Sequence, residues 1–390
     1  MRTVKLADCC KFFSGGTPTK GKNDYWNGEI PWFSPKDIKS FELVASQDRI
    51  SEIAVRESAT RLVKPGTILV VGRSGVLAHT LPIGIVRQPS TFNQDIKAIV
   101  PSDDYDPEYV ALYLTSRQSF VLKEGVKRGP TVHSLISDFI EELEIPDIPI
   151  DHQRQIAARL KAQLAVVETA RQAAQAQLRE INVALNRAIE SQIVDAISSS
   201  EETVKLGDVS KITAKLVQPK QDNFANLPHV SAENIESLTG RLLNIRSAKE
   251  DGMTSGKYLF DAGDILYSKL RPYLRKVAKP DFDGLCSADM YPLKTDDSVL
   301  SMDFLKLLLT SNFFTDYANE KSARSRMPKL NREQLFDFEF SLPSLEKQSQ
   351  CVALIGSFLA LSEQASKAAK SILKDINLLP KKILAQAFEV

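Results

Sequence analysis

Short motifs in this sequence contain residue types that enzymes use for chemistry, but each motif lacks a residue that the chemistry needs. The run from Gly16 to Lys22 fits the GxxxxGK pattern of a phosphate-binding loop, yet Asn23 stands where a magnesium-binding Ser or Thr is required. The run from Gly72 to Gly75 begins like a GxSxG nucleophile elbow, but Val76 replaces the last glycine. The four histidines have no spacing that would build a triad or a metal site. No catalytic constellation is therefore predicted.

The cysteines and prolines also argue against resident chemistry. The four cysteines include no CxxC pair and no companion histidine at a zinc-ligand spacing, so we expect neither a metal site nor a disulfide framework. No two prolines are adjacent, so the Asn-Pro-Pro-aromatic motif of amino-methyltransferases is absent. We therefore expect no cofactor in this chain.

Positive charge is concentrated locally although the net charge is only +1. The stretches 269–279 and 321–332 each hold five Lys or Arg and no acid, so each has the charge to neutralise several phosphates. A solvated charged face is the alternative interpretation of either cluster. Arg73 and Arg128 adjoin glycines in expected loops, where a long side chain suits a major groove. The candidate DNA-contacting residues are Thr17, Thr19, Lys20, Lys22, Arg73, Ser74, Lys127, Arg128, Lys269, Arg271, Tyr273, Arg275, Lys276, Arg324, Arg326 and Lys329.

The chain repeats itself. Thr3–Asp8 returns as Thr203–Asp208, and Ile30–Ser34 returns as Leu227–Ser231. Because the order is kept and the offset stays between 195 and 200, an internal duplication is the better explanation. Two like domains suit a target with two half-sites. The other matching pairs are Gly66–Leu69 with Gly263–Leu266, Leu112–Ser116 with Leu307–Ser311, and Ile145-Pro146 with Leu342-Pro343.

Within the first repeat, short β-rich runs at 67–71 and 96–100 alternate with Gly- and Pro-containing turn signals. One helix is predicted over 107–122, ahead of Gly125. Trp32 lies among strand-like neighbours, so we expect it in the core. This pattern predicts a mixed α/β domain.

Two long helices are predicted after the repeats. Residues 151–197 contain no Pro or Gly, and their apolar positions follow the 4-3 spacing of a coiled-coil seam over roughly 70 Å. A second alanine-rich helix follows Leu342-Pro343. Each helix is apolar along one stripe only, so we expect the two to pair, antiparallel, with the globular domains at opposite ends. The predicted seam residues are Leu160, Leu164, Val167, Leu178, Ile181, Leu185, Phe358, Ile372, Ile376 and Leu379.

The predicted architecture is α+β: two similar mixed α/β domains separated by two long helices, which pair as an antiparallel coiled coil with a pseudo-two-fold repeat. The predicted parts are residues 1–149, 150–200, 201–343 and 344–390. No apolar run approaches the ~20 residues that span a bilayer, and no secretory signal opens the chain. We therefore expect a cytoplasmic protein without a membrane segment.

Three groups of residues resemble one known family. Ser14–Thr19, Tyr25–Gly28 and Ile30–Trp32 resemble the opening of a target recognition domain in the specificity (HsdS) subunits of type I restriction-modification enzymes. Ile145-Pro146 followed by Gln153–Ile156, and Leu342-Pro343 followed by Gln348, resemble that family's entries into its two long helices. Leu384–Phe388 resembles its C-terminal end. The second repeat departs from the pattern, because 214–219 replaces the Gly-Gly-Thr-Pro run.

This resemblance implies an adaptor that reads double-stranded DNA and performs no chemistry. Residues 1–149 and 201–343 would be the first and second target recognition domains, each reading one half of a bipartite site, and the helices 150–200 and 344–390 would set the spacer. Two methyltransferase (M) subunits, which carry S-adenosylmethionine, would dock on the helices, and two restriction/translocation (R) subunits would complete the complex. The near-neutral charge fits, because partner subunits can supply much of the phosphate contact.

Three alternatives stay open on the sequence. A recognition subunit of a type II restriction-methylation enzyme would have the same domains and helices. A coiled-coil scaffold whose end domains bind proteins explains the helices and the duplication, but not the two acid-free basic clusters. An enzyme has the least support.

Overall fold

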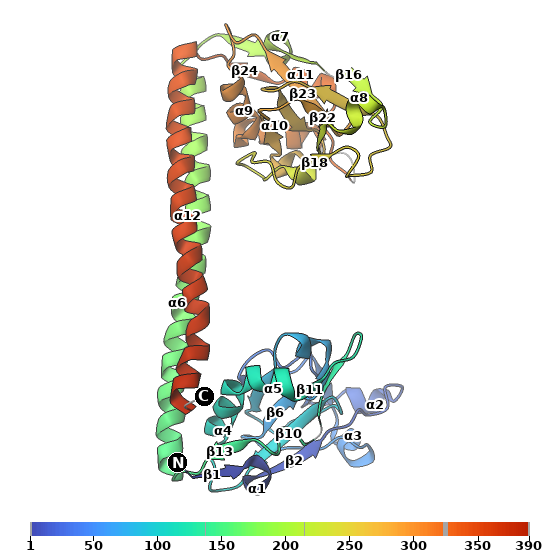
Figure 1. The fold of residues 1–390 in the computed structure, drawn as a ribbon, viewed down its shortest axis with the longest axis vertical. Coiled ribbons are helices and arrows are strands. Elements are labelled where there is room, and N and C mark those ends of the chain that lie inside the picture. Colours follow the sequence, from blue (N-terminus) through green and yellow to red (C-terminus); the bar gives the residue numbers. More distant parts are fainter. Residues whose placement is uncertain (1, 137, 214, 323–326, 389–390) are drawn as a thin grey trace. The chain divides into compact units, whose positions relative to one another are not determined.

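The computed structural model describes residues 2–136, 138–213, 215–322 and 327–388, and all structural statements below refer to these residues. The contacts divide the chain into two compact units. The first unit is Met1–Ala174 with Ile372–Val390, and the second unit is Gln175–Ser371. Each unit therefore combines one globular region with one end of each long helix (Figure 1).

The globular region of the first unit is a mixed α/β fold, as the sequence predicts. Its largest sheet has five strands in the order β2-β10-β6-β8-β4, and there are two separate three-stranded sheets, β5-β3-β9 and β11-β12-β7. The elements are β1 (Thr3–Lys5), α1 (Leu6–Cys9), β2 (Cys10–Ser14), α2 (Asn23–Trp26), β3 (Ile30–Phe33), β4 (Glu42–Leu43), β5 (Asp48–Ile50), α3 (Glu52–Glu57), β6 (Ile68–Val71), β7 (Arg73–Ser74), η1 (Gly75–Ala78), β8 (Ile83–Val86), β9 (Thr91–Phe92), β10 (Ile96–Pro101), α4 (Pro107–Ser116), α5 (Gln118–Glu124), β11 (Val126–Lys127), β12 (His133–Leu135), β13 (Glu144–Pro146) and α6 (Ile150–Ser198).

The globular region of the second unit is also a mixed α/β fold, with a four-stranded sheet, β15-β23-β20-β21, and a five-stranded sheet, β16-β19-β22-β17-β18. Its elements are β14 (Thr203–Lys205), α7 (Leu206–Val209), β15 (Ser210–Ile212), β16 (Lys215–Val217), α8 (Asp222–Ala225), β17 (Pro228–Val230), η2 (Ala232–Asn234), β18 (Arg246–Ser247), β19 (Lys257–Phe260), β20 (Ile265–Ser268), η3 (Pro272–Leu274), β21 (Val277–Ala278), β22 (Gly284–Cys286), β23 (Met290–Thr295), α9 (Met302–Thr310), α10 (Asn312–Ser322), α11 (Arg332–Phe336), β24 (Glu339–Ser341) and α12 (Leu345–Phe388).

The duplication is visible in strand pairing. β1 pairs antiparallel with β13, with Thr3 opposite Pro146, and β14 pairs antiparallel with β24, with Thr203 opposite Ser341. In each unit this small sheet joins the first strand of the globular region to the last strand before a long helix. The repeated residues therefore form repeated structure.

The helix predicted over 107–122 is two helices. Asp106 caps α4 by accepting from the backbone N–H groups of Glu108 and Tyr109, and Pro107 occupies the first turn, where its missing N–H is harmless. α4 ends at Ser116, Arg117 lies between the two helices, and α5 begins at Gln118. An apolar run alone does not reveal such a break, since both helices bury apolar side chains.

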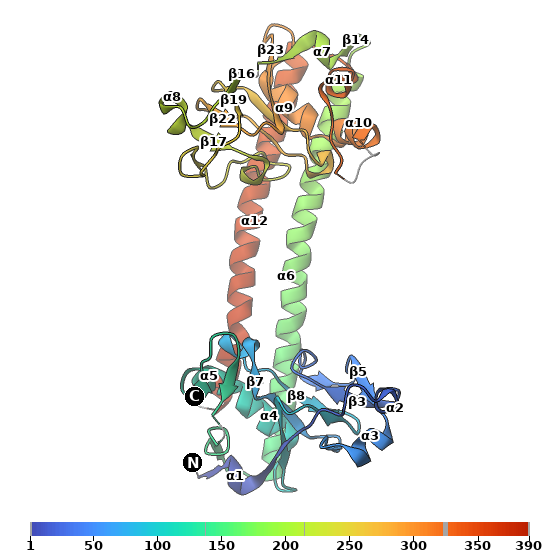
Figure 2. The ribbon, with the colours of Figure 1, turned by 90° about the vertical axis from the view of Figure 1, so that its right-hand side faces the viewer.

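The long helices α6 and α12 pack together, antiparallel, in each unit (Figures 1 and 2). In the first unit, Leu160 near the start of α6 belongs to the same apolar core as Leu384 near the end of α12. In the second unit, Ile193 near the end of α6 shares a core with Ile355 near the start of α12. The predicted α+β architecture with two long paired helices is confirmed.

The seam of α12 drifts relative to the predicted heptads. Cys351 is 3% exposed, but Ile372 and Leu379, three and four heptads later, are 51% and 39% exposed. An α-helix has 3.6 residues per turn, so a strict seven-residue series rotates by ~20° per heptad unless the helices supercoil. Ile372 and Leu379 therefore face outward, and Ala369 and Leu384 take the buried positions. The remaining predicted seam residues are buried (Leu160, Val167, Leu185) or half-buried (Leu164, Leu178, Ile181, Phe358, Ile376).

This drift makes a matched pair of substitutions informative. Ile355→Ala should lower the free energy of unfolding by about 2–4 kcal/mol, because it empties a fully buried site. Ile372→Ala removes the same atoms from an exposed site and should change stability by less than about 0.5 kcal/mol. Urea unfolding followed by circular dichroism measures both. Equal losses would show that Ile372 belongs to the seam after all.

Candidate nucleic-acid interface

In the first unit, a three-stranded sheet brings together cations that are far apart in the sequence. Ser134 on the central strand β12 lies opposite Arg73 on β7 and opposite Lys127 on β11. Residues directly opposite each other in an antiparallel sheet share a face, so the two cations flank Ser134 on one side. Arg73 and Lys127 are exposed, as is Arg128, the residue after β11.

The β11–β12 hairpin that holds these cations turns at Gly129. A Cβ at Gly129 would lie 2.4 Å from the backbone oxygen of Val132, so no larger residue fits there. Its N–H donates to His133 Nδ1 (3.3 Å). Ser134 and His133 are not among the contact residues predicted from the sequence. The Gly129-Pro130 turn between two short β-like runs is the signal that predicts such a hairpin.

A second feature of the first unit is the Gly-Gly-Thr-Pro loop. A Cβ at Gly15 or Gly16 would meet backbone atoms of neighbouring segments at 2.2 and 2.6 Å, which explains both glycines. The loop is held by Trp32, whose Nε1 donates to Gly16 O (3.0 Å); Trp32 is 6% exposed, as expected for a core residue. Thr19 and Lys20 are exposed on this loop, whereas two other predicted contact residues, Thr17 and Lys22, bond to Gln94 and Tyr25.

The second unit repeats the same strand pairing. Leu270 bridges to Lys329, and these positions follow Arg73 and Ser134 by 197 and 195 residues. Two backbone hydrogen bonds extend the bridge, from Arg271 N to Pro328 O and from Leu330 N to Lys269 O. Both units therefore place an exposed cation at this pairing. In the first unit the cation is Arg73 on β7, and in the second unit it is Lys329, on the segment that pairs with Leu270.

The segment after β20 presents further exposed side chains. Arg271 and Arg275 have φ of 50° and 48°, the left-handed region that residues with a Cβ rarely adopt, and they bracket the short helix η3. Pro272 is buried between them, while Arg271 is exposed and Tyr273 is 53% exposed. Left-handed residues persist where surrounding contacts fix them, and they cluster at binding sites.

Three of the predicted contact residues have internal partners instead. Lys269 is 9% exposed and lies 3.5 Å from Asp289 Oδ1, and Lys276 Nζ donates to the backbone oxygens of Ala232 (2.7 Å) and Ile235 (2.9 Å). Arg275 contacts Glu190 of α6 at 3.6 Å. Their contacts give these residues a structural role, and their predicted contact with DNA stays a prediction.

The ion pair to α6 is partly desolvated. Burial raises the pKa of Glu190, while a backbone N–H of Asn312 and the Arg275 guanidinium act in the opposite direction. Arg275 also donates to the Asn312 side chain. This cluster therefore fixes the η3 segment against α6 within the second unit. The predicted residues Arg324 and Arg326 lie outside the described residues.

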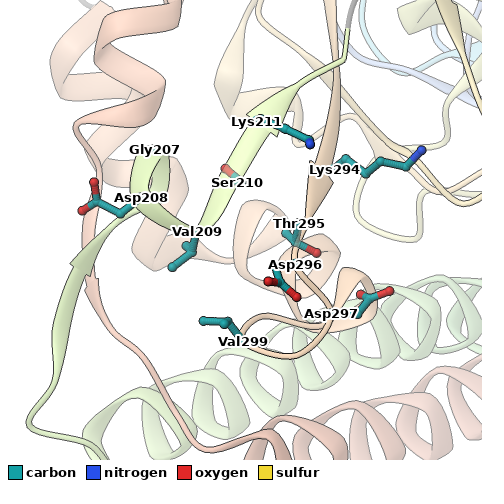
Figure 3. A pocket seen from close by; sticks show the side chains of 10 residues that line it. All are labelled: Gly207, Asp208, Val209, Ser210, Lys211, Lys294, Thr295, Asp296, Asp297 and Val299. Atoms are coloured by element: carbon teal, nitrogen blue, oxygen red, sulfur yellow. The ribbon is translucent and has the colours of Figure 1, made fainter.

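A hollow of about 660 Å³ lies on another part of the second unit (Figure 3). Figure 3 shows Lys211 and Lys294 on the neighbouring strands β15 and β23, with Asp296 and Asp297 on the turn after β23. Lys294 is paired with Asp261 at 2.9 Å, and Asp296 accepts two hydrogen bonds from Ser298. These charges hold the local turns, and they form no catalytic arrangement.

Within the described part of the chain, no three His, Cys, Asp or Glu residues gather as metal ligands. The four cysteines are buried and unpaired, and burial raises the pKa of the Cys351 thiol to about 11. None of the described helices has both the length and the apolar character to cross a bilayer.

The chain matches a known family model along most of its length. Residues 1–179 and 199–371 match the type I restriction modification DNA specificity domain. The specificity subunit of the type I restriction enzyme EcoDI from Escherichia coli is 35% identical over 193 residues, which cover 50% of this chain and 42% of that protein. That of EcoR124I/EcoR124II, also from Escherichia coli, is 38% identical over 152 residues, covering 39% and 38%. These alignments span about two fifths of each relative's own length.

Two solved structures share the fold over nearly the whole chain. One, from work on complex assembly and conformational transition of the type I R-M system, has a TM-score of 0.75 at 17% identity and covers 99% of this chain and 97% of its own. The HsdS subunit from Thermoanaerobacter tengcongensis has a TM-score of 0.58 at 16% identity, covering 99% and 96%. The family match, together with this fold, confirms the resemblance noted in the sequence: the chain belongs to the type I restriction-modification DNA specificity family.

Proposed function

We propose that this chain is the DNA-recognition subunit of a type I restriction-modification complex, in which each globular region reads one half of a bipartite site. The repeated pairing of Arg73 with Ser134 and of Leu270 with Lys329 carries the proposal. It gives each unit an exposed cation at the same strand pairing, on one strand in the first unit and on the opposing segment in the second, beside loops that hold further exposed polar groups. Such groups position a protein on phosphates and reach base edges.

The proposal includes partner subunits that perform the chemistry. Two methyltransferase subunits, carrying S-adenosylmethionine, would bind the long helices, and two restriction/translocation subunits would complete the complex. Outward apolar side chains support helix docking. In the first unit Val166 and Ile372 are 69% and 51% exposed, and in the second unit Leu354 and Leu361 are 48% and 62% exposed. Burying them in an interface would remove apolar surface from water.

The proposed function is tested by mapping methylated sites. The chain is expressed with its methyltransferase partner, and modified positions are located by sequencing. A hybrid whose residues 1–149 come from a relative with another target should change one half of the site and keep the other half. A hybrid that changes both halves would contradict the assignment of one region to one half-site.

Neutralising the exposed cations should weaken DNA binding in a salt-dependent way. A plot of log K against log salt has a negative slope. For Arg271→Gln combined with Lys329→Gln, the steepness of this slope should decrease by about 0.9 for each phosphate that the protein no longer neutralises, hence by about 1.8 for two. Lys205→Gln is the matched control, because Lys205 is an exposed lysine of the same unit that is paired with Asp337 (3.0 Å). Fluorescence anisotropy at several salt concentrations measures the slope. An unchanged slope in the double variant would mean that both residues belong to a solvated surface.

A further inference from the structure

A cavity of about 500 Å³, separate from the hollow of Figure 3, lies in the second unit where β17 ends. Its wall includes His229 from β17 and Lys257 from β19, which are 4% and 5% exposed. Burial lowers the pKa of Lys257. Buried nitrogen-bearing side chains beside a cavity are sites where a polar ligand can replace the hydrogen bonds that water would otherwise supply.

The two ring nitrogens of His229 differ in their hydrogen bonding. Its Nδ1 lies 3.0 Å from Asp251 Oδ2, and an ionised carboxylate only accepts, so Nδ1 carries the proton. In the neutral imidazole Nε2 is then an acceptor. This buried atom has no hydrogen-bond partner among the described residues. Buried polar atoms normally have partners, so Nε2 of the neutral imidazole suits a ligand group that donates.

The equivalent position in the first unit is occupied by a tryptophan. Trp32 precedes His229 by 197 residues, and both lie on strands with a parallel partner, Trp32 opposite Thr91 and His229 opposite Leu285. The indole of Trp32 donates to Gly16 of the Gly-Gly-Thr-Pro loop. In the second unit the segment that replaces this loop includes β16, which pairs with β19. The imidazole of His229 is smaller than the indole of Trp32, and it borders the cavity. The two units therefore differ at a position where the duplication would make them alike.

The wall of the cavity combines donors and acceptors. Lys257 Nζ donates to Ser255 O (3.0 Å) and Ser255 Oγ (2.8 Å). A lysine ammonium has three N–H groups, so the third can donate to a ligand. The carboxylates of Glu233 and Asp289 add acceptors, and Met253 and Met290 add polarisable apolar surface. A planar heterocycle with an amino group and a ring or carbonyl acceptor matches this set.

The cavity adjoins the candidate interface. Leu270 lines it, and the next residue is the exposed Arg271. Asp289 lines it as well and pairs with Lys269 at 3.5 Å. The same short segment therefore borders the cavity and presents the exposed cation that was assigned to DNA above.

We propose that this cavity binds a nucleobase that carries an exocyclic amino group, with His229 Nε2 accepting a hydrogen bond from that group. This inference rests on the proposed function. The base belongs either to the second half-site of the DNA or to a free nucleoside, and two experiments distinguish these sources. Adenine, cytosine and guanine have exocyclic amino groups, whereas thymine has none.

The first experiment uses the full chain and free nucleosides. Saturation-transfer NMR should detect adenosine, cytidine or guanosine bound at millimolar concentration, and thymidine should give no signal. His229→Trp, which introduces the residue of the first unit, should abolish the signal. Thymidine binding equal to that of the other nucleosides would overturn the role of the amino group.

The second experiment maps methylated sites of the complex that contains His229→Trp. If the base comes from the DNA, discrimination at one position of the second half-site should fall by about 5- to 100-fold, with the first half-site unchanged. Lys257→Met, which keeps the side-chain length, should act at the same position, and exposed Lys249→Met serves as its control. Where circular dichroism shows that His229→Trp is unfolded, Lys257→Met decides both experiments.

The outcomes separate this inference from the proposed function. Nucleoside binding with unaltered DNA sites supports the cavity with a free nucleoside as ligand, and altered sites support a base of the DNA. No nucleoside binding together with unaltered sites overturns the cavity assignment, while the bipartite DNA specificity stands.

Discussion

Replacing Gln348 with leucine should lower the free energy of unfolding of the second unit by about 2–5 kcal/mol. Gln348 is fully buried near the start of α12. Its Oε1 accepts from Ser301 N (2.8 Å), and its Nε2 donates to Val299 O (3.0 Å) and Pro343 O (2.9 Å). Leucine leaves these three backbone groups buried without that partner, at about 1–3 kcal/mol for each unsatisfied group before relaxation.

In the first unit, the side-chain amide of Gln153 joins α6 to the segment before α4 in the same way. Gln153 and Gln348 are called the clamp glutamines below. Gln153 accepts from Asp106 N (2.9 Å) and donates to Asp104 O (3.1 Å) and Ile148 O (2.8 Å). Asp106 and Ser301 are the N-caps of α4 and α9, so each glutamine ties the start of a short helix to a long one. Gln153→Leu should therefore destabilise the first unit by a similar amount.

Two nearby glutamines are the controls for this prediction. Gln155 and Gln350 are exposed and lie two residues after the clamp residues. Their replacement by leucine adds the same apolar side chain without orphaning a buried backbone group, so stability should change by less than about 0.5 kcal/mol. Urea unfolding monitored by circular dichroism compares the four variants. A loss in Gln350→Leu as large as that in Gln348→Leu would refute the clamp.

The architecture was predictable because it is encoded redundantly. Five matched segments mark the duplication, and an absence of Pro and Gly over 151–197 marks the first long helix. The clamp glutamines show the limit of this information. Gln153 and Gln155 are the same residue type in the same turn of one helix, yet only Gln153 is buried, because burial depends on how α6 meets α4.

The candidate interface was predictable only as a charge pattern. Lys269 and Arg271 lie in one basic cluster, but Lys269 is turned inward beside Asp289 and Tyr291, and Arg271 is exposed. The difference comes from the end of β20 and the left-handed backbone at Arg271, neither of which charge reveals. The same holds for the seam, where heptad counting over several turns accumulates a rotation that placed Ile372 on the wrong side.

Four residues inserted after Gln177 in α6 should lengthen the unspecified spacer of the recognition site by one or two base pairs, with both half-sites unchanged. This result follows if the paired long helices set the spacing between the half-sites. A helix rises ~1.5 Å per residue, so the insertion adds about 6 Å. Base pairs stack at about 3.4 Å, which converts the added length into the expected one or two pairs.

The insertion is tolerable because four residues are close to one helical turn, so the apolar stripe of α6 stays nearly in phase with α12. An eight-residue insertion adds about 12 Å and should lengthen the spacer by three or four base pairs, with a larger loss of stability because the seam is shifted twice as far. Substituting residues 176–179 without changing the length is the control, and it should leave the spacer as it was. Sequencing of methylated sites from complexes with each variant measures the spacer. If an active complex that carries the insertion keeps the original spacer, the long helices do not set the distance between the two half-sites.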